Sequence, residues 1–164
     1  MRAYVAVGSN LADRWANLGR AARFLRGAPL VAVLRASRVY DSEPVGPPQP
    51  RYLNAVLELE TGRTPESLHQ LLREAEDEAL RDRRKGARWG PRTLDLDLLL
   101  FGDRIVRTAA LTVPHPRMAH RRFVLAPLAE LAPALVVPGT GATVAALLAA
   151  APPLAVVPSG LYPA

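Results

Sequence analysis

Residues 88–101 read "RWGPRTLDLDLLLF", a segment in which two aspartates interrupt a run of leucines. Its length and alternation predict a β-strand from Thr93 to Phe101. Side chains at positions i and i+2 of a strand share a face, so Asp95 and Asp97 should project together with roughly 7 Å between their Cα atoms. The opposite face should carry the leucines that enter the core, which are Leu94, Leu96 and Leu98.

This pair of acids indicates a metal site. Two neighbouring carboxylates repel and raise each other's proton affinity unless a cation neutralises them. Mg²⁺ suits such a sparse site because it binds through one or two carboxylates together with phosphate oxygens. Two alternatives stay open: the acids pair with arginines on a polar sheet face, or they serve a glycosidase, although their spacing leaves little room for a sugar.

The segment directly before the strand, residues 81–92, reads "RDRRKGARWGPR". So many cations would repel one another in a helix, so an exposed, mobile loop is expected. Beside a metal-binding pair of acids, these groups could close over a polyphosphate and stabilise the charge that develops in phosphoryl transfer. The alternatives are a solvated basic loop and a nucleic-acid-binding segment that uses arginine and Trp89. The cations are Arg81, Arg83, Arg84, Lys85, Arg88 and Arg92.

The sequence on the N-terminal side predicts strands separated by helices. Residues 2–7 read as a short buried strand. Asp13 can cap a helix from about Arg14 to Arg26, which Gly27 ends. A second strand is expected over about residues 30–40.

Residues 41–61 predict a loop and then a third strand. "DSEPVGPPQP" carries four prolines in ten residues, so it should form a stiff, exposed loop. "YLNAVLELET", residues 52–61, has the alternation of a half-buried strand. A helix capped by Thr64 should follow and end near Arg81.

These elements give the order β-α-β-β-α-β, with a short partner strand around residues 104–107 after the predicted fourth strand. That order is typical of a ferredoxin-like split βαβ fold, with a mainly antiparallel sheet and both helices on one face. Helices near residues 123–131 and after Thr143 should cover the other face and give an αβα sandwich. The last residues, 151–164, show no usable periodicity.

The composition fits one domain over residues 1–164, since the chain has no internal repeat and no long linker. Its formal charge is +6 and Lys85 is the single lysine, so arginine supplies nearly all the positive charge, which favours planar contacts with phosphate or carboxylate. Codon bias and heat adaptation would explain the arginine, alanine and proline content equally well. The lack of cysteine excludes disulfides and thiolate metal sites, and the N-terminus is too short an apolar run for a signal or membrane span, so a cytoplasmic location is expected.

Five blocks in this order identify a resemblance: "VGSNLADRWANL", "SEPVG", "RYLNAVLELET", "RWGPRTLDLDLLLFG" and "LTVPHPRMAHRRFVLAPLAELAP". Over residues 3 to about 138 the chain resembles the 6-hydroxymethyl-7,8-dihydropterin pyrophosphokinases of folate biosynthesis. The resemblance implies that MgATP donates its β,γ-pyrophosphoryl unit to the hydroxymethyl group of the pterin and leaves AMP. It implies ATP and the pterin as partners, with no nucleic acid and no membrane, and a monomer is expected.

The resemblance also implies roles for individual residues. Asp95 and Asp97 would be catalytic and would bind two Mg²⁺ ions, and Arg83 and Arg92 would stabilise the transferred group. The pterin would be bound by Ser42, Val45, Tyr52, Asn54, Trp89 and Phe123. The nucleotide would be bound by Glu76, Arg81, Arg83, Arg88, Trp89, Arg92, Leu98, Thr112, His115 and Arg121.

Three of these residues also have a plainer interpretation. Tyr52 and Phe123 could be core aromatics rather than a clamp for a flat ring. His115 could be a loop histidine bonded to a backbone carbonyl. For pterin binding, the side chain of Asn54 offers both a hydrogen-bond donor and an acceptor to the amide-like edge of the ring. No residue is an evident general base, so Asp97 or solvent would accept the proton of the substrate.

Overall fold

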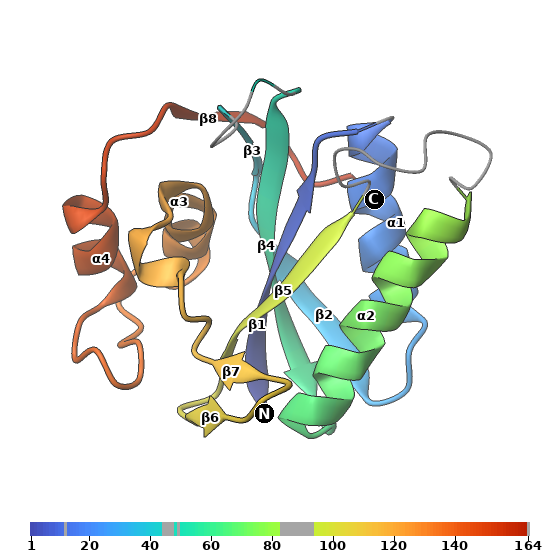
Figure 1. Ribbon diagram of the computed structural model, residues 1–164, viewed down its shortest axis with the longest axis horizontal. Helices are drawn as coiled ribbons and strands as arrows, with labels where there is room; N and C mark the ends of the chain where they lie inside the picture. The colour runs from blue at the N-terminus through green and yellow to red at the C-terminus, as the bar shows by residue number, and fades with distance from the viewer. Residues whose placement is uncertain (12, 44–47, 49, 83–93, 164) are drawn as a thin grey trace.

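The computed structural model describes residues 1–11, 13–43, 48, 50–82 and 94–163. A six-stranded sheet runs through the middle of the molecule in the order β5-β1-β4-β3-β8, with β2 also paired to β4 (Figure 1). Every pairing in it is antiparallel. Its strands are β1 (Arg2–Ser9), β2 (Val31–Ala36), β3 (Val39–Ser42), β4 (Tyr52–Thr61), β5 (Asp95–Phe101) and β8 (Val156–Gly160).

Helices cover both faces of this sheet (Figure 1). On one side lie α1 (Arg14–Arg26) and α2 (Pro65–Asp82), which bury their apolar stripes against β1, β4 and β5. On the other side lie α3 (Arg122–Leu131) and α4 (Val144–Ala150), with a second core around Tyr4, Val56 and Leu125. The later helices therefore lie opposite α1 and α2, as expected. The remaining elements are β6 (Val106–Arg107), β7 (Thr112–Val113) and the 3₁₀ helix η1 (Met118–His120).

Local capping signals place the helix starts where the sequence predicts them. The side chain of Asp13 accepts a hydrogen bond of 3.1 Å from the backbone N–H of Ala16, and Thr64 does the same for Ser67 at 3.1 Å. Thr143 caps α4 in the same way. Each bond satisfies a donor that the first turn of a helix leaves unpaired.

Three strand predictions need correction. The strand expected over residues 30–40 is two strands, because the chain breaks at Ser37, whose hydroxyl accepts a hydrogen bond from the Val56 N–H and donates one to the Arg38 carbonyl. The short strand near residues 104–107 pairs with β7 instead of β5. β4 is not half-buried: it lies inside the sheet under helices on both faces, so even Asn54 is only 7% exposed and Glu58 2%.

Two carboxylates fix α3 to the sheet. Glu58 of β4 accepts hydrogen bonds from Tyr4 at 2.8 Å and from Arg35 at 3.0 and 2.8 Å, and Arg35 also donates to the Leu131 carbonyl at the end of α3. Glu130 of α3 accepts from Tyr40 of β3 at 2.7 Å. These bonds hold the C-terminal end of α3 against the strands, and the opposite end of the helix borders the cavity described next.

Candidate active site

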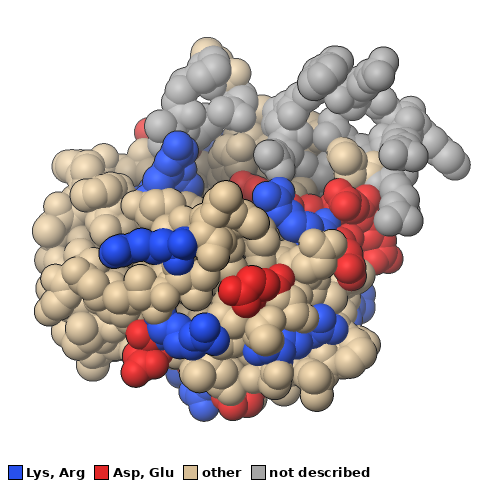
Figure 2. Space-filling view, turned by 60° about the horizontal axis from the view of Figure 1, so that its bottom comes forward, with Lys and Arg blue, Asp and Glu red and all other residues tan. Residues whose placement is uncertain are grey.

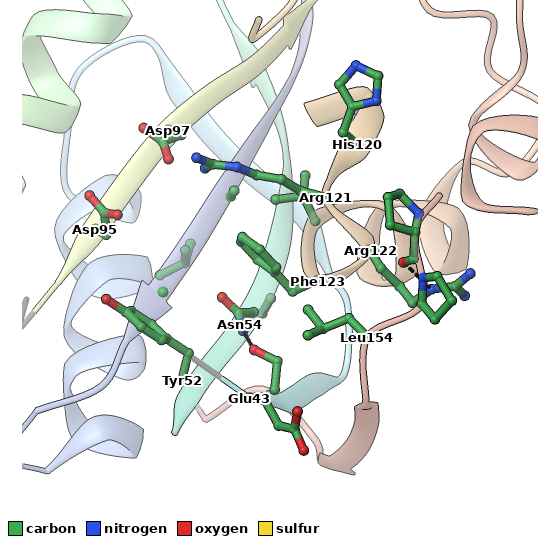
Figure 3. A pocket seen from close by; sticks show the side chains of 18 residues that line it. Glu43, Tyr52, Asn54, Asp95, Asp97, His120, Arg121, Arg122, Phe123 and Leu154 are labelled. Carbon is green, nitrogen blue, oxygen red and sulfur yellow. Dashed lines mark hydrogen bonds between the residues drawn. The ribbon is translucent and has the colours of Figure 1, made fainter. Parts of the chain in front are cut away.

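A cavity of about 500 Å³ opens on the α3 side of the sheet (Figure 3). Residues of β1, β3, β4 and β5 form its floor, and the start of α3 and the segment after α4 form its wall. Its lining residues are Ala6, Val7, Gly8, Ser42, Glu43, Tyr52, Asn54, Ala55, Asp95, Asp97, His120, Arg121, Arg122, Phe123, Val124, Pro152, Pro153 and Leu154.

One end of the cavity is acidic. Asp95 and Asp97 point into it from β5, and Arg121 extends toward Asp97 from the start of α3 (Figure 3). The leucines that alternate with these acids are buried on the other face of the strand, against α1 and α2. The predicted separation of acids and leucines is therefore confirmed.

The acidic end suits Mg²⁺. Asp97 is 40% exposed and offers hard oxygen donors to the cavity. Within the described part of the chain, no group of three or more histidine and acidic side chains could enclose a metal ion unaided. An open pair of carboxylates is what Mg²⁺ takes when phosphate oxygens and water supply its remaining ligands.

His115 stands beside this pair, with its Nε2 atom 4.0 Å from an Asp97 carboxylate oxygen. The backbone N–H of Arg117 donates to its Nδ1 at 3.2 Å, so the neutral ring carries its proton on Nε2, toward Asp97. Burial lowers the pKa of His115, and the neighbouring Asp97 carboxylate opposes that shift. The ring therefore presents a neutral N–H donor to the acidic end.

Glu76 reaches the same strand from α2. Its carboxylate accepts a hydrogen bond of 2.8 Å from the backbone N–H of Leu96, between the two aspartates. β5 lies at the edge of the sheet, so this bond satisfies a donor that no strand pairs. Glu76 thus supports the backbone that carries the acids.

The other end of the cavity is lined by two aromatic rings and a side-chain amide. Tyr52 and Asn54 face it from β4, and Phe123 faces it from α3 (Figure 3). Asn54 donates to the Ser42 hydroxyl at 2.7 Å, which fixes the orientation of its amide. The Arg121 guanidinium carbon lies 5.6 Å from the centre of the Phe123 ring and so links the two ends.

Some predicted residues lie elsewhere. The side chain of Leu98 is buried in the core on the opposite face, so its predicted nucleotide contact, which stays a prediction, would use the backbone. Thr112 is exposed on β7 and does not line the cavity. Arg81 lies in the last turn of α2, and nothing further is described of its side chain. The predicted residues outside the described part of the chain are Val45, Arg83, Arg84, Lys85, Arg88, Trp89 and Arg92.

A family model for 7,8-dihydro-6-hydroxymethylpterin-pyrophosphokinase (HPPK) matches residues 4–133. The chain belongs to the HPPK family. A 2-amino-4-hydroxy-6-hydroxymethyldihydropteridine pyrophosphokinase of Bacillus subtilis is 45% identical over 130 residues, which are 79% of this chain and 77% of the relative. The protein of that name from Pseudomonas aeruginosa is 44% identical over 152 residues, 92% of each chain.

Solved structures show the same fold at low sequence identity. A crystal structure of a Plasmodium falciparum HPPK-DHPS triple mutant superimposes with a TM-score of 0.71 at 12% identity. A second HPPK-DHPS structure, in complex with substrates, gives 0.70 at 11% identity. Each superposition covers 91% of this chain and 43% of the solved chain, so the chain spans less than half of these longer proteins.

Proposed function

We propose that this HPPK family member transfers the β,γ-pyrophosphoryl group of MgATP to the hydroxymethyl group of 6-hydroxymethyl-7,8-dihydropterin and releases AMP, as a step of folate biosynthesis. The observation that carries the proposal is a single cavity with a carboxylate pair at one end and two aromatic rings with an oriented amide at the other. A polyphosphate with its cations suits the first end, and a flat ring with an amide-like edge suits the second.

In this proposal Asp95 and Asp97 hold two Mg²⁺ ions, which would neutralise the oxygens of the ATP phosphates. Tyr52 and Phe123 stack on the pterin, and Asn54 and Ser42 bind its edge. The substrate hydroxyl oxygen bonds to the β-phosphorus as the bond from that phosphorus to the AMP oxygen breaks, and the hydroxyl proton passes to Asp97 or to solvent. Catalysis then rests on positioning and on charge stabilisation.

The nucleotide contacts are proposed from the resemblance and from the geometry of the acidic end. His115 and Arg121 border the pair of acids, which supports phosphate contacts for both. Glu76 would act through the β5 backbone, since its carboxylate bonds the Leu96 N–H. The remaining proposed nucleotide contacts are Arg81, Arg83, Arg88, Trp89, Arg92, Leu98 and Thr112, and Val45 is proposed on the pterin side.

Further parts of the proposal concern the whole molecule. A ferredoxin-like split βαβ topology is supported by the sheet order β5-β1-β4-β3 and by α1 and α2 on one face. A single domain over residues 1–164 is supported by a sheet that joins residues near both ends of the chain. We also propose a monomer in the cytoplasm, and the cysteine-free sequence supports the location. None of the described helices has the length and apolar character of a membrane span.

The experiment is an assay with ATP, Mg²⁺ and 6-hydroxymethyl-7,8-dihydropterin, with the nucleotide products separated. We expect AMP and the pyrophosphorylated pterin in equal amounts. ADP as the nucleotide product, or no turnover, would refute the proposal.

The carboxylate role has its own test in Asp97→Ala. Asp97 is partly exposed, so the variant should unfold at the wild-type temperature while turnover falls at least about 100-fold, because the charge of the phosphates is no longer balanced. Asp77→Ala, on the exposed face of α2, is the matched control and should turn over normally. Normal turnover of Asp97→Ala would end the metal-site interpretation.

The nucleic-acid-binding alternative receives no support from the family match or the relatives. Among the described residues on the face shown in Figure 2, acidic and basic side chains are interspersed. Binding to DNA or RNA that weakens steeply with salt, without any turnover, would favour that alternative.

A further inference from the structure

The chain after α4 supplies part of the cavity wall. Pro152, Pro153 and Leu154 line the cavity together with the predicted ring-binding residues Tyr52 and Phe123. This segment lies beyond residues 4–133, which the family model matches, and it has no sequence signal that predicts a site.

Contacts on both sides hold this segment in place. On its N-terminal side, the Arg122 guanidinium donates to the carbonyls of Leu148, Ala151 and Pro152 at 3.3, 3.2 and 3.4 Å. A planar guanidinium can serve three carbonyls at once, which a lysine cannot do with the same geometry. Arg122 is the first residue of α3, next to Phe123, so the segment is tied to the element that carries the aromatic ring.

On its C-terminal side, β8 pairs with β3 so that Val156 lies opposite Ser42. Farther along, the Tyr162 hydroxyl donates to the Leu18 carbonyl of α1. A Cβ added to Gly160 would lie only 3.2 Å from the Trp15 ring, so β8 also packs closely on α1. The wall is therefore a fixed surface and not a loose end.

Leu154 lies at the end of the cavity opposite Asp95 and Asp97, on the far side of Phe123 from the acids (Figure 3). It is an apolar lining residue at the end that also carries the rings of Tyr52 and Phe123, the Asn54 amide and the polar residues Ser42 and Glu43. A polar substituent placed against it would lose water without gaining a partner, whereas an apolar ring edge would gain contact.

We propose that Leu154 is a specificity-determining residue for the ring of the substrate and that Arg122 is the positioning residue that holds it there. This proposal rests on the proposed function, because it takes the aromatic end of the cavity as the pterin end. It assigns no role to Leu154 toward ATP.

The test is Leu154→Ala, with Leu161→Ala as the matched control. Leu161 belongs to the same tail but is 81% exposed and does not line the cavity. Direct titration with 6-hydroxymethyl-7,8-dihydropterin should give a Kd about tenfold higher for Leu154→Ala and unchanged for Leu161→Ala. The KM for ATP should stay at the wild-type value in both variants.

The outcomes separate the two proposals. If Leu154→Ala binds the pterin as tightly as the wild type, the wall has no part in recognition and this inference fails while the proposed function stands. If the wild type itself binds no pterin, both fail. Leu154→Phe provides a second test, because it fills space in the pocket instead of creating it. The larger side chain should reduce the affinity for the pterin. A Leu154→Phe variant that binds the pterin as tightly as the wild type would overturn the inference.

The role of Arg122 is tested by a double-mutant cycle. Arg122→Ala alone should raise the KM for the pterin about as much as Leu154→Ala and leave kcat within about twofold. In the Leu154→Ala background, Arg122→Ala should cause no further loss of pterin affinity, because Arg122 acts by holding the wall that carries Leu154. Additive losses, or a fall in kcat with no change in the pterin KM, would refute the positioning role.

Discussion

At the scale of single residues, the cavity floor depends on a close approach of two strands. Gly8 of β1 lies opposite Asn54 of β4, and a Cβ at Gly8 would lie 3.3 Å from the Asn54 side-chain oxygen. That oxygen belongs to the amide that Ser42 orients. The small residue at position 8 therefore leaves room for the acceptor that the pterin is proposed to use.

Gly8→Ala tests this requirement. The added methyl group should displace the Asn54 amide by a few tenths of an ångström and raise the pterin Kd several-fold, while the free energy of unfolding falls by about 1 kcal/mol. Gly62→Ala is the control, since its Cβ would meet only the Leu30 side chain at ordinary contact distance. Equal pterin affinity in Gly8→Ala and the wild type, measured by titration, would contradict the prediction.

Sequence reasoning located those site residues whose chemistry is unusual for their surroundings. Asp95 and Asp97 stand out because they lie two residues apart in a leucine-rich strand, directly after an arginine-rich segment. Leu154 and Arg122 could not be found in this way, because an isolated leucine after two prolines, or one arginine in an arginine-rich chain, carries no local signal. Their roles depend on contacts between residues distant in sequence, here 26–30 positions for Arg122.

At the scale of elements, α3 is held against the sheet by the Glu58 carboxylate. The guanidinium of Arg35 holds the pKa of Glu58 below its ordinary value, with Tyr4 as a further donor. Because the pKa is lower in the folded chain than in the unfolded chain, the ionised carboxylate stabilises the fold at neutral pH. That contribution is lost as the pH falls below the ordinary carboxyl range toward the lowered pKa.

Glu58→Gln should therefore reduce the free energy of unfolding by about 2 kcal/mol at pH 7, and the difference from the wild type should shrink as the pH falls below 4.5. Denaturant titrations between pH 7 and pH 3 measure both effects. Glu74→Gln, on the exposed side of α2, should stay within about 0.5 kcal/mol of the wild type throughout. A difference between Glu58→Gln and the wild type that does not depend on pH would exclude the ionic contribution.

Helices were predictable and several strands were not, for a physical reason. The bounds of α1 follow from Asp13 and Gly27, which act within the helix itself. Strand bounds depend on partners: β2 and β3 separate where Ser37 bonds the middle of β4, and β8 forms because β3 offers a partner. β8 shows no buried alternation, so its sequence carries no period to detect.

At the scale of the whole molecule, the two ends of the sequence meet in one sheet, and the C-terminal residues close over α1. Burial raises the pKa of Tyr162, whose hydroxyl donates to the Leu18 carbonyl. The contribution of the neutral phenol to the stability of the folded chain is therefore complete when the pH is below the ordinary tyrosine pKa of 10.0. This contribution is lost as the pH rises above that value toward the raised pKa.

Tyr162→Phe should lower the free energy of unfolding by about 1 kcal/mol at pH 7 through the lost hydrogen bond. Between pH 9 and pH 11 the wild type should lose more stability than the variant, so the two denaturation curves converge. Other tyrosines titrate in both proteins and cancel in the comparison. Parallel curves over this range would show that the Tyr162 phenol is not buried as described.

The alternation on β5 has a consequence for how the chain reaches this fold. A slip of β5 by one residue against β1 would exchange its faces and drive both aspartates among Leu18, Leu72 and Val5. Two unneutralised charges in that environment would cost several kcal/mol each. The acids proposed for catalysis therefore also disfavour this misaligned pairing of the edge strand, because it would bury both of them in the core.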